Sequence, residues 1–197
     1  LEDIAVAMVA SGKGLLAADE SSGTIKKRFD SINVTSTEDA RRDYREMLFR
    51  ADDAMKNYIS GVILFDETLR QKAKDGTPLV DVMRNAGSIP GIKVDMGAKP
   101  LAGFAGETIT EGLDGLRERL SEYYALGARF AKWRGVISIS SSLPTYGAIK
   151  QNAQALARYA ALCQEAGFVP IVEPEILMDG VPGFHSIDRN YEVSEAV

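Results

Sequence analysis

The sequence predicts an α/β fold in which short parallel strands alternate with helices. Its 197 residues are 45% hydrophobic and 26% charged, the composition of an ordinary globular domain. Five short apolar runs recur along the chain, and segments with the apolar spacing of helices separate them. No low-complexity or linker-like stretch interrupts the pattern. We therefore expect one α/β domain over residues 1–197, with right-handed crossovers.

Each apolar run is bounded by glycine, proline or a charged residue. Near-continuous apolar runs of this length are typical of strands buried on both faces, as in parallel sheets. Pro170 makes the fifth run the weakest prediction, because proline donates no hydrogen bond to a strand ladder. The predicted strands are 14–18, 61–65, 90–94, 129–133 and 168–172.

The segments between the strands carry helix signals. Ser36 and Asp39 stand at the spacing of a capping box before the first helix. Pro144 lies near the first turn of the last helix, and Gly167 ends it. The predicted helices are 37–51, a weaker pair within 67–84, 111–126 and 144–166. The predicted apolar face of the first helix consists of Ala40, Tyr44, Met47, Leu48 and Ala51.

The scarcity of cysteine and histidine excludes several classes of site. Cys163 is the one cysteine and His185 the one histidine, so no internal disulfide forms and no zinc site or other metal centre is expected. We expect Cys163 and Trp133 to be packing residues. The net charge of −5 argues against a nucleic-acid partner, and no apolar run is long enough to span a membrane. Because Met is absent at position 1, we expect the chain to begin inside a longer reading frame or after processing.

Charged residues end every predicted strand. Because side chains two residues apart share a face of a strand, Lys93 pairs with Asp95, Lys132 with Arg134, and Glu173 with Glu175. Charges at the ends of five strands favour an active site at the C-terminal face of a (β/α)8 TIM barrel. An open doubly wound sheet is the alternative, but no glycine fingerprint for a dinucleotide follows the first strand. For any one pair taken alone, a loop start or a structural ion pair is the favoured explanation, and the functional interpretation rests on the five strands together.

These residue types fit Schiff-base chemistry. A lysine that is desolvated near another cation has a lowered pKa and can attack a carbonyl carbon. Lys132 and Lys93 both stand where such an environment is expected, and Asp19 and Glu173 are natural proton carriers beside them.

A phosphate-binding segment follows the first strand. Hydroxyl groups and main-chain N–H groups lead into a short helix with three successive cations, Lys26, Lys27 and Arg28. A helix cap followed by a solvated basic face is the alternative interpretation. The segment reads Ser21-Ser22-Gly23-Thr24-Ile25-Lys26-Lys27-Arg28.

Seven motifs, in order along nearly the whole chain, resemble class I fructose-bisphosphate aldolase. They are Leu16-Ala17-Ala18-Asp19-Glu20-Ser21, Gly61-Val62-Ile63-Leu64-Phe65, Gly91-Ile92-Lys93-Val94-Asp95, Pro100-Leu101-Ala102-Gly103, Gly112-Leu113-Asp114-Gly115-Leu116, Ala131-Lys132-Trp133-Arg134 and Val172-Glu173-Pro174-Glu175-Ile176. The resemblance implies a (β/α)8 barrel of which this chain supplies about the first five βα units. It also implies a cytoplasmic, homo-oligomeric enzyme without metal or cofactor. That enzyme cleaves fructose 1,6-bisphosphate into glyceraldehyde 3-phosphate and dihydroxyacetone phosphate in glycolysis and gluconeogenesis.

The resemblance also assigns roles to residues. It implies that Asp19 assists carbinolamine formation and carbon–carbon cleavage, and that Glu173 is the general acid/base with Glu175 beside it. It implies that Lys132 supports the developing charge and contacts substrate. The implied substrate- and phosphate-contacting residues are Lys93, Arg134, Ser21, Thr24, Lys27, Arg28 and Arg41.

In the family that it resembles, the Schiff-base lysine lies on the sixth strand, in a Glu-Gly-Thr-Leu-Leu-Lys-Pro-like segment. Residues 1–197 contain no such segment, so we expect this lysine beyond Val197. A catalytically inactive, sugar-phosphate-binding or scaffolding half-barrel is the alternative function. Another Schiff-base aldolase or a transaldolase is disfavoured by the number of matching motifs.

Overall fold

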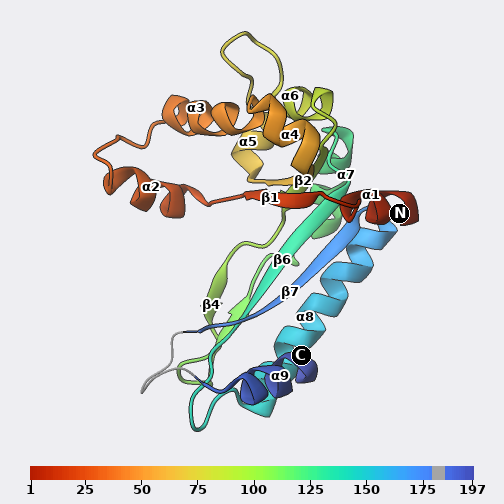
Figure 1. Ribbon diagram of the computed structural model, residues 1–197. Coiled ribbons are helices and arrows are strands. Elements are labelled where there is room, and N and C mark those ends of the chain that lie inside the picture. Colours follow the sequence, from red (N-terminus) through yellow and green to blue (C-terminus); the bar gives the residue numbers. More distant parts are fainter. Residues whose placement is uncertain (179–184) are drawn as a thin grey trace.

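The computed structural model describes residues 1–178 and 185–197 and is built around a curled, five-stranded parallel sheet (Figure 1). All five predicted strands are present, and the last two extend past the charged residues that end the apolar runs. The strands are β1 (Gly14–Ala18), β2 (Ile59–Leu64), β3 (Ile89–Lys93), β6 (Phe130–Ile137) and β7 (Val169–Ile176).

The order of the strands in space identifies the architecture. Across the sheet the order is β1-β2-β3-β6-β7, which is the order along the chain, and each neighbouring pair is parallel. A doubly wound sheet reverses its order at a switch point, whereas barrel strands follow one another around the axis. The sheet is therefore the N-terminal part of a (β/α)8 barrel.

Most of the helices lie on the outer side of this sheet. In Figure 1, α8 runs alongside β6 and β7, and α2 to α6 gather around β1 and β2. The helices are α1 (Glu2–Met8), α2 (Ser22–Asp30), α3 (Glu38–Phe49), α4 (Asp52–Tyr58), α5 (Asp66–Arg70), α6 (Leu79–Asn85), α7 (Leu116–Ala125), α8 (Tyr146–Glu165) and α9 (Ile187–Ala196). An antiparallel hairpin that the sequence did not predict, β4 (Ala98–Pro100) with β5 (Thr108–Thr110), lies between β3 and α7 in the chain.

Alternation along the strands separates two faces. The outer face packs against the helices in the main core, where Trp133 stacks on Tyr159 of α8 with ring centroids 5.4 Å apart. Cys163 lies in the same core, so the expectation that Trp133 and Cys163 are packing residues is confirmed. The inner face holds a smaller apolar cluster of Ile63, Phe130 and Met8 of α1.

The two outermost strands differ from the prediction of full burial. Most residues of β1 are exposed and those of β7 are half-buried, because each of these strands has one hydrogen-bonded neighbour. Pro170 is compatible with β7 for the same reason. The N–H groups of Val169 and Leu177 donate to the carbonyl groups of Arg129 and Ile137 on the β6 side. Successive main-chain nitrogens of a strand point to opposite sides, so the nitrogen of Pro170 points away from β6, where no donor is needed.

The predicted cap of α3 was wrong, and its predicted apolar face was right only in part. Leu48 packs against the main core and Tyr44 packs edge-to-face on Phe29, whereas Ala51 is exposed. Thr37 rather than Ser36 is the N-cap, and its hydroxyl accepts a hydrogen bond from the Ala40 N–H at 3.1 Å. Met47 is 60% exposed, while Arg45 and Phe49 are fully buried. The helix therefore turns a polar residue into the interior, which apolar periodicity alone does not reveal.

The other predicted helices are present, although α7 begins at Leu116 instead of residue 111, and α1 and α4 were not predicted. The segment 67–84 does contain two helices, α5 and α6. The last predicted helix begins after Thr145, whose hydroxyl caps α8, so Pro144 precedes the cap instead of lying in the first turn. Gly167 follows the end of α8 with a φ of 81°, a left-handed conformation that favours glycine.

Candidate active site

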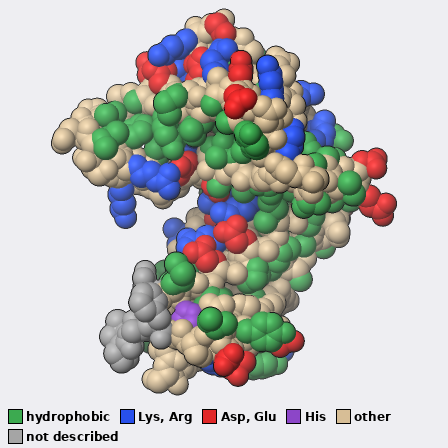
Figure 2. Space-filling view, viewed as in Figure 1, with side chains coloured by type: hydrophobic (Ala, Val, Ile, Leu, Met, Phe, Trp, Pro, Cys, Tyr) green, Lys and Arg blue, Asp and Glu red, His purple; other side chains and the backbone are tan. Residues whose placement is uncertain are grey.

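Charged side chains meet on the inner face of the sheet, at the C-terminal ends of the strands. The Lys132 ammonium lies 3.3 Å from an oxygen of Asp19 and 3.2 Å from an oxygen of Glu173. These residues come from β6, from the end of β1 and from β7. The side chains of Lys132 and Asp19 are 11% and 12% exposed, and that of Glu173 is 33% exposed. Figure 2 shows cations and anions gathered in the hollow between the upper helices and the lower end of the sheet.

The carboxylates control the protonation of Lys132. Burial lowers the pKa of Lys132, but the negative charges of Asp19 and Glu173 outweigh burial and raise it above the ordinary value for lysine. The ammonium therefore stays protonated at neutral pH. This contradicts the environment with a lowered pKa that the sequence pattern had favoured for Lys132. A protonated lysine is a poor nucleophile, but it can stabilise a developing negative charge.

Arg134 and Glu175 form the outer part of the cluster. The Arg134 guanidinium binds both carboxylate oxygens of Glu175, and its Nη2 lies 2.7 Å from one of them. This arginine lowers the pKa of Glu175, so the carboxyl group is ionised. The side chains of Arg134 and Glu175 are 40% and 39% exposed, so a ligand can reach them from the hollow.

Lys93 and Asp95 add a second buried ion pair on the neighbouring strand. Lys93 is in register with Lys132, so both lysines face the inside of the curled sheet. The Asp95 carboxylate accepts hydrogen bonds from Lys93, from the Gly97 N–H at 3.1 Å and from the Arg134 N–H at 3.3 Å. The sequence paired Asp95 with Lys93 but did not include it among the site residues. Its co-facial spacing was the available signal.

The segment after β1 has the features of an anion site. Ser21 is the N-cap of α2, and its hydroxyl lies 3.1 Å from that of Thr24 and accepts the Thr24 N–H at 3.3 Å. Arg28 is paired with the carboxylate of Glu20, the residue after Asp19, whose side chain is 8% exposed. Lys27 is exposed, and none of the carboxylates in the described ranges lies within 4.0 Å of its ammonium.

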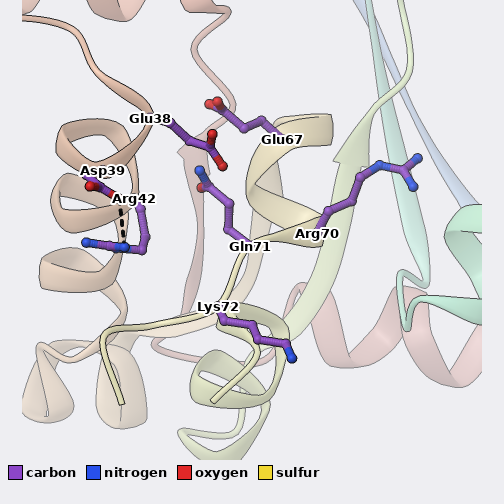
Figure 3. Close-up of a pocket in the computed structure, with 7 residues that line it drawn as sticks. All are labelled: Glu38, Asp39, Arg42, Glu67, Arg70, Gln71 and Lys72. Carbon is purple, nitrogen blue, oxygen red and sulfur yellow. Dashed lines mark hydrogen bonds and ion pairs between the residues drawn. The ribbon is translucent and has the colours of Figure 1, made fainter. Parts of the chain in front are cut away.

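Arg41 is engaged elsewhere. Its guanidinium binds both oxygens of Glu67 at 2.6 and 2.8 Å, and both side chains are largely buried. Glu67 borders a surface pocket of about 380 Å³ between α3 and the end of α5 (Figure 3). Lys132, Asp19 and Glu173 do not line this pocket, and Arg42 and Asp39, which do, pair with each other. The pocket is therefore separate from the cluster around Lys132.

Two further observations limit the kind of site. Within residues 1–178 and 185–197, no group of three or more His, Cys, Asp and Glu side chains is arranged to hold a metal ion. None of the helices described here has both the length and the apolar character needed to cross a bilayer.

Comparison with known proteins assigns the family. Residues 1–197 match the family model described as "Glycolytic: Fructose-bisphosphate aldolase class-I". The chain belongs to the class I fructose-bisphosphate aldolase family. The resemblance carried by the seven sequence motifs is thereby confirmed.

Individual relatives of this aldolase chain agree. It is 60% identical over 196 residues to the "Probable fructose-bisphosphate aldolase class 1" of Xanthomonas campestris, covering 100% of this chain and 58% of that protein. It is 59% identical over 186 residues to the cytoplasmic isozyme of Spinacia oleracea, covering 94% of this chain and 51% of that protein. The aldolase chain thus spans between half and three-fifths of the length of these relatives.

A solved structure shows the same fold. The fructose-bisphosphate aldolase of Plasmodium falciparum, determined in a complex with TRAP and a small-molecule inhibitor, superposes with a TM-score of 0.91 at 49% identity. The match covers 98% of the aldolase chain and 55% of the Plasmodium chain.

Proposed function

We propose that this chain is the N-terminal part of an enzyme that reversibly cleaves fructose 1,6-bisphosphate. The products are glyceraldehyde 3-phosphate and dihydroxyacetone phosphate, and the reaction proceeds through a lysine Schiff base. Membership of the aldolase family supports this proposal, and the placement of Lys132 between Asp19 and Glu173 carries it. The relatives named as cytoplasmic or cytosolic support a cytoplasmic location. The homo-oligomeric state stays a prediction.

The proposed chemistry separates the nucleophile from the groups around it. The nucleophilic lysine, supplied from outside residues 1–197, attacks the substrate carbonyl carbon and forms a C–N bond. The carbonyl oxygen takes up protons and leaves as water, which gives the iminium ion. Asp19 and Glu173 are proposed to move these protons, and Glu175 lies two residues from Glu173 on β7.

Lys132 has a different role in this proposal. The pKa of Lys132 is raised, so its ammonium remains a cation. This cation can stabilise negative charge that develops on substrate oxygen atoms as the carbon–carbon bond is cleaved. Lys93 and Arg134 line the same inner face and are proposed to contact substrate. The proposed phosphate contacts are Ser21, Thr24, Lys27, Arg28 and Arg41.

Reduction of the Schiff base tests the proposal. The full-length protein is treated with borohydride in the presence of dihydroxyacetone phosphate, and the modified lysine is located by mass spectrometry. We expect an adduct on a lysine outside residues 1–197, together with turnover of fructose 1,6-bisphosphate. An adduct on Lys132 or Lys93 would overturn the assigned roles. Sugar-phosphate binding without adduct or turnover would favour the non-catalytic alternative.

A matched pair of lysine variants separates the loss of Lys132 from the general effect of removing one lysine charge. Lys132→Met is expected to reduce kcat in the full-length enzyme by more than a hundredfold, on the order of the loss for a missing electrostatic group. Lys150→Met, which removes an exposed lysine of α8, is expected to retain wild-type kcat. Equal activity of the two variants would remove Lys132 from the proposed mechanism.

A further inference from the structure

Arg45 is a buried cation on the helix that faces the end of β1. Its side chain is 0% exposed and projects from α3 to the main chain on both sides of Asp19. The Arg45 Nε donates to the carbonyl oxygen of Ala18 at 3.3 Å, and its Nη2 donates to the carbonyl oxygen of Glu20 at 2.7 Å. One guanidinium therefore binds two carbonyl groups that bracket Asp19.

Burial of the Arg45 guanidinium costs free energy that its hydrogen bonds and ion pairs offset only in part. The Arg45 Nη1 has no hydrogen-bond partner in the described part of the chain, and burial lowers the pKa of the guanidinium. The nearest carboxylate oxygen, that of Glu20, lies 3.7 Å from Nη2 and is itself without a hydrogen bond. One turn further along α3, the same face carries the fully buried Phe49. Packing alone would be satisfied by an apolar residue at position 45.

The planarity of the peptide bond explains what the two contacts fix. The Ala18 carbonyl belongs to the peptide plane before Asp19, and the Glu20 carbonyl belongs to the plane after Glu20. Holding both planes restricts the backbone dihedral angles between them, and these angles set the direction of the Asp19 side chain. The Asp19 carboxylate lies 3.3 Å from the Lys132 ammonium in this arrangement.

We propose that Arg45 is a positioning residue that directs the Asp19 carboxylate toward Lys132 by holding the carbonyl groups of Ala18 and Glu20. The positioning is a property of the fold. Its kinetic consequence rests on the proposed aldolase function, because Asp19 is placed there among the proton-carrying groups.

The titration of Lys132 tests the positioning without reference to catalysis. In the full-length protein, the pH dependence of acetylation of Lys132 by trace acetic anhydride is followed by mass spectrometry of the peptide that contains it. Arg45→Met is expected to lower the pKa of Lys132, because Asp19 is no longer held beside the ammonium, and Asp19→Asn supplies the reference for complete loss. Phe49→Leu, a matched core variant of the same helix, is expected to leave this pKa unchanged although it lowers Tm.

A conservative variant and the kinetics complete the test. Arg45→Lys can reach one carbonyl but not both, so we expect an intermediate pKa of Lys132 even if Arg45→Met does not fold. In the active enzyme, Arg45→Met is expected to reduce kcat by on the order of tenfold to a hundredfold with little change in KM. An unchanged Lys132 titration in a folded Arg45 variant overturns the proposal. A shifted titration in a protein without aldolase activity would leave the positioning intact and remove the proposed function instead.

Discussion

The aromatic ring of Phe130 occupies the space that a side chain on Gly91 would need. A β-carbon on Gly91 would lie 2.3 Å from two carbon atoms of this ring. Phe130 and Gly91 are in register on neighbouring strands, and two residues further along the same strands are Lys132 and Lys93. The ring therefore lies on the same inner face as Lys132 and Lys93, one inward-facing position before them along the strands.

Gly91→Ala is therefore expected to destabilise the protein. Overpacking of this kind costs about 1–3 kcal/mol, and direct overlap with a buried ring places the variant at the upper end. Urea unfolding measures the loss. Gly14→Ala is the matched control, because a β-carbon there meets no atom within 4 Å. The double variant Gly91→Ala with Phe130→Leu should recover part of the stability, and full additivity of the two changes would contradict the assigned contact.

Asp19→Asn is expected to destabilise the protein in a pH-dependent manner. The folded-state pKa of Lys132 is raised above its ordinary value of 10.5, so the ion pair stabilises fully below that pH and loses its contribution as pH rises through the folded-state pKa. The variant should lose about 1.5–3 kcal/mol at pH 7. This difference from wild type should shrink at strongly alkaline pH. Urea unfolding at neutral and alkaline pH checks this, and a difference that does not depend on pH would contradict it.

Thr37→Ala and Ser36→Ala distinguish the two candidate caps of α3. The Thr37 hydroxyl accepts the Ala40 N–H, so its removal is expected to cost about 1 kcal/mol of unfolding free energy. The Ser36 hydroxyl instead accepts from Arg41 at 3.3 Å, and the Ser36 carbonyl accepts from the same guanidinium at 3.1 Å. Ser36→Ala keeps the carbonyl contact and should cost less. The reverse ranking in thermal unfolding would restore Ser36 as the cap.

Cys163 is expected to be unreactive in the folded protein. Burial raises the pKa of its thiol to about 12, and the side chain is 0% exposed. Labelling by a thiol reagent at pH 8 should then be limited by opening of the fold and should accelerate steeply with urea. Rapid stoichiometric labelling without denaturant would show that the core around α8 is open. Cys163 is the one cysteine of residues 1–197, so labelling within these residues has a single source.

Strand positions were predictable because apolar runs and charges alternate sharply, as in β1, whose bounds equal the predicted ones. The prediction failed where a strand continues through charged residues. In β6 the ladder extends beyond Lys132 and Arg134 to Ile137, since inward-facing charges are satisfied by partners across the sheet. The hairpin of β4 and β5 was also missed. Each of its strands has three residues, too few to show a period.

The site was predictable to the extent that it follows from alternation and strand direction. The Lys132–Asp19 contact joins residues 113 positions apart, and the barrel arrangement accounts for it. The function of Arg45 was not visible, because an arginine on a helix is usually solvated and only the packed structure shows which residues it reaches. Arg41 was assigned to phosphate from the resemblance. Its contact with Glu67 depends on how α3 and α5 pack, and its phosphate role stays a prediction.

Trp133, stacked on Tyr159, is the one tryptophan fluorophore of residues 1–197. It is fully buried, and it directly follows Lys132 while pointing to the opposite face of β6. Its ultraviolet emission therefore arises one residue from the centre of the charged cluster, on the dry side of the same strand. A displacement of β6 would change the surroundings of the Trp133 ring and therefore its emission, without any label attached.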